Sequence, residues 1–247
     1  MKNFNQLPIL NNTPLENNPF TTQSTTREIV LRVTEPTTTS NMKQIFEIED
    51  ENALLQAIFT ANAFNQALIP IESDGYKSLY FDVELALKVV ETLNPPGAIF
   101  GSINQILTQK ENTVETMIEK VTDVFLTQLN LTLSTDSLNS IRAALTNTFT
   151  NLDAQKTDAW IFYQQNDAFK SSYTYNILFS FINEKTGTSM ITIPIGFYIQ
   201  AESKSKKILW VTYDDKVSYE VHIQALKVIQ PLINTSATLL NTISRLV

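Results

Sequence analysis

Apolar residues follow two different periods along the chain, after an irregular start. Residues 1–26 are rich in Asn, Thr and Pro and show no period, and their prolines prevent a regular hydrogen-bond ladder. Residues 27–34 alternate apolar with polar side chains, as a strand does, and a Pro- and Thr-rich linker follows over 35–41. We therefore expect residues 1–40 to form an N-terminal arm that carries a strand on a tether.

The next part of the chain has the period of amphipathic helices. Asp50 is a suitable N-cap for the first helix, and the third has the clearest apolar stripe, opposite Glu115, Glu119 and Asp123. Four helices are predicted, joined into two antiparallel hairpins: Asp50 to Leu68, about Asp82 to Leu93, Val114 to Leu129, and from the capping residues at 134–136 to Leu152.

From Trp160 the period falls to two, which predicts strands. Pro231 lies inside a predicted closing helix that begins at Leu226, and the chain from Thr235 onward looks loosely held. The expected strands are Ala159 to Tyr163, Ser172 to Asn183, Ser189 to Gln200, Lys207 to Tyr213 and Val217 to Ile223. Helices followed by an antiparallel meander indicate a single α+β domain (α/β layered), with two helical hairpins packed on a mostly antiparallel β-sheet.

Composition narrows the function classes. The 247 residues fit one large domain, and 18 basic against 25 acidic residues give a net charge of −7, which disfavours a nucleic-acid partner. The absence of cysteine excludes thiol chemistry and disulfides. The first twelve residues lack the apolar run of a secretory signal, and the uncharged run Asn52 to Ile71 is too polar for a permanent transmembrane helix.

Little catalytic chemistry is visible. The single histidine, His222, shares a strand face with Ser218 and Glu220, which is typical of a solvent-facing or capped position and gives a hydrolase little support. The glycines stand apart, without a phosphate loop, and the acidic run at 47–51 is better explained by a helix N-terminus than by a divalent cation. The sequence therefore predicts no catalytic residue, no cofactor and no metal site.

Two of the predicted strands are unusually long. Strands of this length reach across a bilayer, although pattern alone favours the simpler interpretation that helices cover a long aromatic-rich sheet. The residues on the shared apolar face are the candidates for membrane contact: Tyr173, Tyr175, Ile177, Phe179, Phe181, Ile193, Ile195, Phe197 and Ile199.

Four stretches of the chain resemble one toxin family. They are Leu55–Pro70, Thr146–Phe162, Tyr173–Phe179 and Gln224–Leu232, and in order and spacing they are similar to the cytolytic δ-endotoxins, the Cyt-type crystal toxins of insecticidal Bacillus. The likeness spans about residues 27 to 233. It implies a layered fold of helical hairpins on a sheet and a protein that acts on membrane lipid without an enzymatic step.

The resemblance also implies how the protein is stored, processed and delivered to its target. The protoxin would be stored in a parasporal crystal inclusion, dissolve in the insect gut, lose both ends to host proteases and act at midgut cell membranes. Residues 41–233 would form the toxin domain and residues 234–247 a removable tail. The dimer strand of the protoxin would contain Ile29, Leu31 and Val33, and trypsin-like cuts are expected at Arg32, Lys43 or Arg245. Membrane phospholipids, a homodimer, a membrane-bound homo-oligomer and co-produced crystal toxins are the expected partners.

The membrane step has more than one interpretation at this level. The helical hairpins would lift so that the long strands insert and form an oligomeric pore, or the helices would disrupt the bilayer as a detergent does. A lipid- or glycan-binding module that docks without perforating is a further class, with Trp210, Tyr213 and Tyr219 as its candidate contacts.

Overall fold

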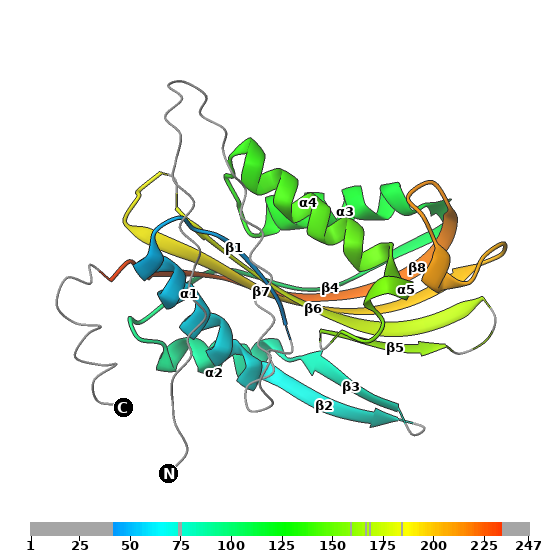
Figure 1. Ribbon diagram of the computed structural model, residues 1–247, viewed down its shortest axis with the longest axis horizontal. Coiled ribbons are helices and arrows are strands. Elements are labelled where there is room, and N and C mark those ends of the chain that lie inside the picture. The colour runs from blue at the N-terminus through cyan, green and yellow to red at the C-terminus, as the bar shows by residue number, and fades with distance from the viewer. Residues whose placement is uncertain are drawn as a thin grey trace, which may run out of the picture.

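A long mixed sheet forms the middle layer of the protein (Figure 1). A computed structural model describes residues 42–73, 76–158, 160–165, 167, 169–183 and 185–233. The sheet has six strands in the order β1-β6-β7-β8-β4, with β5 also paired to β6. Their bounds are β1 Lys43–Glu47, β4 Ala98–Thr113, β5 Ile161–Gln165, β6 Lys170–Ile182, β7 Ser189–Ser203 and β8 Lys216–Pro231.

Helices cover both faces of this sheet (Figure 1). On one face lie α3 (Val114–Gln128), α4 (Thr135–Phe149) and the short α5 (Leu152–Gln155). On the other lie α1 (Glu51–Phe64), α2 (Val83–Thr92) and a separate hairpin of β2 (Leu68–Ser73) and β3 (Tyr76–Phe81). The two coverings bury two distinct hydrophobic cores. The predicted fold class is confirmed.

The helices begin where short polar side chains cap them. Asp50 accepts a hydrogen bond from the Ala53 amide at 2.8 Å, so the acidic run at 47–51 ends in an N-cap as expected. Asp82, Thr113 and Ser134 do the same for α2, α3 and α4. The first helix ends earlier than predicted, because a 3-10 turn at Asn65–Ala67 leads directly into β2.

The central strands pair in antiparallel register over most of their length. Tyr173 lies opposite Ile199, and Phe181 lies opposite Ile191. Besides β7, the strand β6 pairs with two short strands. It pairs with β1 in parallel and with β5 in antiparallel orientation. The long hairpin predicted for β6 and β7 is confirmed.

Two predictions near the C-terminal end are wrong. Lys207 to Tyr213 is a loop around a 3-10 turn at Ile208–Trp210, because Asp215 accepts hydrogen bonds from the Thr212 amide and hydroxyl that hold the segment in a turn. The segment from Leu226 is the end of β8 and not a helix. Leu226 and Val228 pack under α1 and α2, whereas Ile223 and Ala225 pack under α3 and α4, so both sets are buried.

The sequence analysis missed β1, β4 and the β2–β3 hairpin. The strand β4 lies at a sheet edge, and its covered side carries Gln105 and Gln109 whereas its exposed side carries Ile106, so its sequence lacks the apolar–polar alternation that identifies a strand. The β2–β3 hairpin lies between α1 and α2, where the sequence analysis predicted no regular element.

Gly196 permits a close approach between the β2–β3 hairpin and the sheet. A Cβ atom added at Gly196 would lie 2.3 Å from the Phe81 Cβ, and Phe81 is fully buried. We expect Gly196→Ala to lower the free energy of unfolding by about 1–3 kcal/mol, the usual cost of overpacking a core.

Urea unfolding followed by circular dichroism measures this change. Gly101→Ala is the matched control on β4, because its added Cβ would meet no atom closer than 3.4 Å. Equal destabilisation by the two substitutions would contradict the packing role of Gly196.

Candidate functional site: the two faces of the central sheet

All the membrane-contact candidates lie on one face of the sheet. Tyr173 to Phe181 of β6 and Ile193 to Ile199 of β7 point this way at every second position, and each is at most 5% exposed. Val221, Ile223 and Ala225 of β8 extend the same face, which we call the α3–α4 face. The candidates are therefore brought together and fully covered by helices.

Aromatic packing holds the helices to this face. Phe125 of α3 and Phe149 of α4 meet Phe197 edge to face, with ring centroids 6.2 and 6.4 Å apart. Phe149 also meets Tyr219 of β8 at 5.3 Å. Such contacts add to hydrophobic burial but carry no directional polar tie, so most of this interface is dry.

A few polar contacts fix the ends of the helical pair. The Tyr173 hydroxyl donates to the Thr148 carbonyl at 3.1 Å near the end of α4. Lys227 of β8 donates from Nζ to the carbonyls of Leu129 and Asn130, both at 3.0 Å, where α3 ends. A cation at a helix C-terminus pairs with unsatisfied carbonyls and with the helix dipole. The sequence analysis missed this contact because it placed Lys227 in a helix.

The opposite face, under α1 and α2, is tied by amide side chains. The Gln224 Oε1 accepts from the Val83 amide at 3.3 Å, and the Asn176 Nδ2 donates to the Leu79 carbonyl at 3.1 Å. Gln230 accepts from the Thr60 hydroxyl at 3.0 Å and donates to the Pro95 carbonyl at 2.8 Å. The second face therefore combines an apolar core with buried amide hydrogen bonds.

His222 lies on this second face, half-buried. Its Nε2 is 2.8 Å from the Asn104 Oδ1, and its Nδ1 is 3.4 Å from the Tyr80 hydroxyl. Burial and the nearby Asp82 carboxylate raise the pKa of Tyr80, which keeps this hydroxyl neutral. The two ring nitrogens therefore contact neutral groups and not the nucleophile and carboxylate of a hydrolytic triad.

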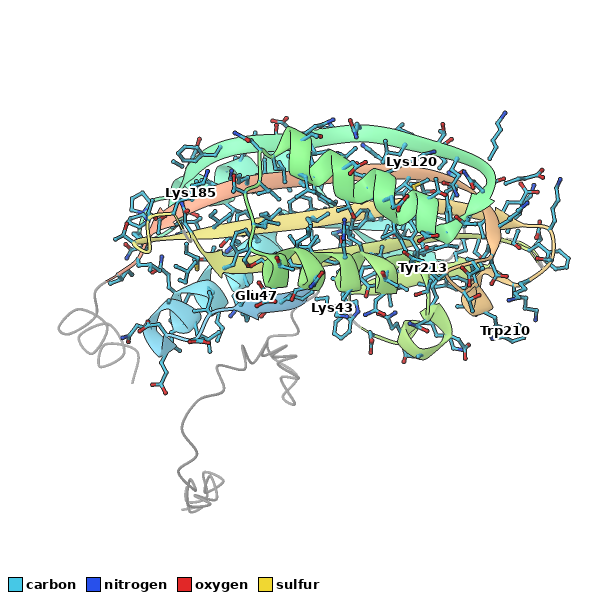
Figure 2. The ribbon with its side chains drawn as sticks, turned by 90° about the horizontal axis from the view of Figure 1, so that it is seen from above. Lys43, Glu47, Lys120, Lys185, Trp210 and Tyr213 are labelled. Atoms are coloured by element: carbon cyan, nitrogen blue, oxygen red, sulfur yellow. The ribbon has the colours of Figure 1, made fainter. Side chains whose placement is uncertain are left out.

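The loop between β7 and β8, which we call the Trp210 loop, forms an exposed aromatic end of the sheet (Figure 2). Trp210 is 57% exposed, with the Lys207 Nζ 5.1 Å from its ring centroid, and Tyr213 is 38% exposed. Tyr219, the third docking candidate, is buried in the α3–α4 core and is not part of this surface. Figure 2 places Trp210 and Tyr213 far along the sheet from Lys185.

Asp215 organises this loop. Its Oδ2 accepts from the Lys206 Nζ at 2.8 Å and from both the amide and the hydroxyl of Thr212 at 2.7 Å. Partial burial acts to raise the pKa of Asp215, but these hydrogen bonds outweigh it, and the pKa lies below its ordinary value. The Asp215 carbonyl also accepts from the Val114 amide, which ties the loop to the start of α3.

The predicted processing and dimer residues have different positions. Lys43 opens β1, opposite Ile177 of β6, and only 8% of it is exposed. Arg32, Arg245 and the dimer-strand residues Ile29, Leu31 and Val33 lie outside the described residues.

Two searches of the described part of the chain complete this account. No group of three or more His, Cys, Asp or Glu side chains there is placed to hold a metal ion. No helix in the same part is long and apolar enough to cross a membrane.

Comparison with known proteins decides the family. The family described as Bacillus thuringiensis toxin matches residues 20–247. The type-1Aa cytolytic delta-endotoxin of B. thuringiensis subsp. morrisoni is 43% identical over 92% of this chain and 93% of its own length. The chain belongs to the cytolytic delta-endotoxins. The resemblance found in the sequence is thereby confirmed.

Solved structures of cytolytic delta-endotoxins agree with the fold. The activated Cyt2Ba monomer of B. thuringiensis subsp. israelensis is 35% identical, with a TM-score of 0.71, and the match covers 78% of this chain and all of that one. A second structure, titled delta-endotoxin, is 33% identical with a TM-score of 0.74 over 93% of this chain and 95% of its own. The relatives are cytolytic toxins, so the protein is assigned as a cytolytic toxin.

Acid is expected to loosen the Trp210 loop. Because the pKa of Asp215 is lowered on folding, its contribution to stability is present above the unfolded value of about 3.9 and is lost as pH falls through the folded value. In a Trp160→Phe background, acrylamide quenching of Trp210 should therefore rise below about pH 4.

Asp215→Asn should remove this acid transition, since the amide cannot lose or gain the charge. Asp153→Asn is the matched control, because Asp153 pairs only with the exposed Lys156 among the described contacts. An acid transition that persists unchanged in Asp215→Asn would show that another group controls the loop.

Proposed function

We propose that this cytolytic delta-endotoxin is made as a protoxin that loses both ends to proteases and then permeabilises membranes with strands β6, β7 and β8. The observation that carries the proposal is the continuous apolar α3–α4 face, covered by a pair of helices and not by another sheet. A bilayer demands that every backbone hydrogen bond be internal, and paired strands in a closed assembly meet that demand.

Removal of the ends has support from the described core. The relative titled activated Cyt2Ba monomer leaves about a fifth of this chain without a counterpart, although the match includes all of that protein. The buried position of Lys43 in β1 favours an N-terminal cut before this residue, and Arg32 is the trypsin-like candidate there. Arg245 is the corresponding candidate at the other end.

The N-terminal arm would keep the protoxin inactive by holding it in a homodimer. A strand containing Ile29, Leu31 and Val33 would add to the sheet edge of a second copy and hold a homodimer, as the resemblance implies. In this proposal the dimer is the stored form, in a parasporal crystal, and the nicked protein oligomerises on midgut cell membranes. Phospholipid is the direct target.

Dye release from phosphatidylcholine vesicles tests the proposal. We expect brief trypsin treatment to convert an inactive protein into one that releases dye, because cutting frees the core from the arm. Arg32→Gln should slow this activation by trypsin, whereas Lys43→Gln, which removes a buried site, should leave it unchanged.

Proteinase K, which does not need a basic residue, should activate all three proteins and serves as the control for intact folding. If nicked protein releases no dye from vesicles that it binds, the permeabilising function is contradicted. The non-perforating docking module, favoured by exposed Trp210 and Tyr213, would then account for the result.

A further inference from the structure

We propose that residues 234–247, which we call the C-terminal tail, fold back over α1 of the same chain and cover two apolar side chains there, Leu55 and Phe59. This inference rests on the proposed function, in which proteases remove the tail, and deepens it by naming the surface that the tail hides. Removal of the tail would then uncover apolar surface on α1, a change distinct from the release of the N-terminal arm.

Leu55 and Phe59, which we call the exposed pair, form an apolar patch on the outer side of α1. Leu55 is 39% exposed and Phe59 is 54% exposed. They lie one helical turn apart, so their side chains are neighbours on the helix surface. Asn52 and Asn62, which flank the pair on the same side, are also exposed but polar. A large aromatic side chain that lies in water beside a second apolar one indicates a surface that another segment contacts.

The end of β8 is bound to α1 beside this pair (Figure 1). The Gln56 Nε2 donates to the Pro231 carbonyl at 3.0 Å, and the Gln56 Oε1 accepts from the Ile233 amide at 3.1 Å. Gln56 is only 3% exposed, so water competes little for these hydrogen bonds. Gln56 therefore fixes the point at which the C-terminal tail leaves the described core.

This exit point lies on the same flank of α1 as the exposed pair. Consecutive residues of an α-helix are rotated by about 100°, so Phe59 and Gln56, three residues apart, lie about 60° apart around the helix axis. Thr60, which donates to the Gln230 Oε1 at 3.0 Å, lies on the far side of Gln56 from Phe59. The tail thus emerges between the buried side of α1 and the exposed pair.

The sequence of the C-terminal tail suits a helix with one apolar side. Its apolar side chains follow the helical spacing i, i+1, i+4, i+7 and i+8, and they are Leu239, Leu240, Ile243, Leu246 and Val247. Thr235 and Ser236 precede them as candidate N-caps. A helix this short is marginal in water by itself, so its formation depends on a surface that its apolar side can cover.

The tail is long enough for this contact. Residues 234–236 can span about 10 Å when extended, which is roughly the width of a helix, so they can turn the chain onto the outer side of α1. From Leu239 to Val247 the apolar side would run about 12 Å, whereas Leu55 and Phe59 lie about 6 Å apart along α1. The exposed pair can thus be covered without moving β8.

Docking would leave the predicted cleavage site of the tail on its water-facing side. Arg245 lies on the opposite side of the expected helix from Ile243 and its apolar neighbours. Cleavage still requires the helix to unfold locally, so the rate of cutting reports how firmly the tail is held. A cut after Arg245 separates Leu246 and Val247 from the rest of the tail, and the loss of these apolar contacts weakens the docking.

Disulfide cross-linking in solution tests the contact. The chain has no cysteine, so variants with two introduced thiols can be compared directly. The test pair is Leu55→Cys with Ile243→Cys in the full chain, oxidised with copper phenanthroline in the absence of vesicles. One control moves the tail thiol to the other side of the helix, as Asn241→Cys. The other control moves the core thiol to Phe100→Cys on β4, because Phe100 is 58% exposed and β4 pairs with the same end of β8.

We expect the test pair to form an intramolecular disulfide about tenfold faster than either control, because docking raises the effective concentration of one thiol at the other. Trypsin cleavage after Arg245, followed by mass spectrometry, is a second readout that needs no cysteine. Phe59→Ser should accelerate this cut about fivefold or more, whereas Phe100→Ser should leave its rate unchanged. Both replaced side chains are more than half exposed, so the described core does not depend on them.

The outcomes are distinguishable. Faster cross-linking of the test pair together with faster cleavage of Phe59→Ser supports the inference. Equal cross-linking rates, or equal cleavage of the two serine variants, overturn it. A disulfide that joins two chains, or a faster one between Leu55→Cys and Leu31→Cys, assigns the exposed pair to a second copy or to the N-terminal arm and also overturns it. Because no membrane is present, a lack of dye release would contradict the permeabilising function and leave the docked tail standing.

Discussion

The alternation of side chains along β6, β7 and β8 is the constraint on which the rest of the structure depends. Because the register aligns Tyr173 with Ile199 and Phe181 with Ile191, the apolar residues of β6 on this face lie beside apolar residues of β7. A slip by one residue would place the amides under α3 and α4 and the apolar residues of this face under α1 and α2. The helices, their caps and the two cores are arranged around a sheet whose faces already differ.

The helices could be predicted because each has a single exposed side. The stripe of α3 and the N-caps Asp50 and Ser134 determine helix type and start locally, so sequence identified them. The end of β8 failed because both of its faces are covered: Ala225 and Leu226 are adjacent and both buried, and a buried run does not distinguish a strand from a helix. The edge strand β4 failed for another reason: polar Gln109 is buried on its covered side, and apolar Ile106 is exposed on the other.

The arrangement of the candidate site was predictable on its apolar face and not in its polar contacts. Alternation identified the membrane-contact candidates from Tyr173 to Ile199, since they need only a period of two. The polar contacts are hydrogen bonds made by Lys227, Gln224 and Asn176. They join segments that lie about a hundred residues or more apart in sequence, so no local pattern predicts them. The burial of Tyr219 is likewise set by Phe149 of another element.

The proposed function requires one set of strands to satisfy two solvents, water and lipid. In water the α3–α4 face must be hidden, and aromatic contacts such as Phe149 with Tyr219 hide it without many directional bonds. Dry contacts of this type lose little when acyl chains replace helices, because both are apolar, whereas a face tied by buried hydrogen bonds would lose each bond on entering lipid. In the proposed function, the distribution of polar ties between the two faces therefore determines which helices the sheet can release at a membrane.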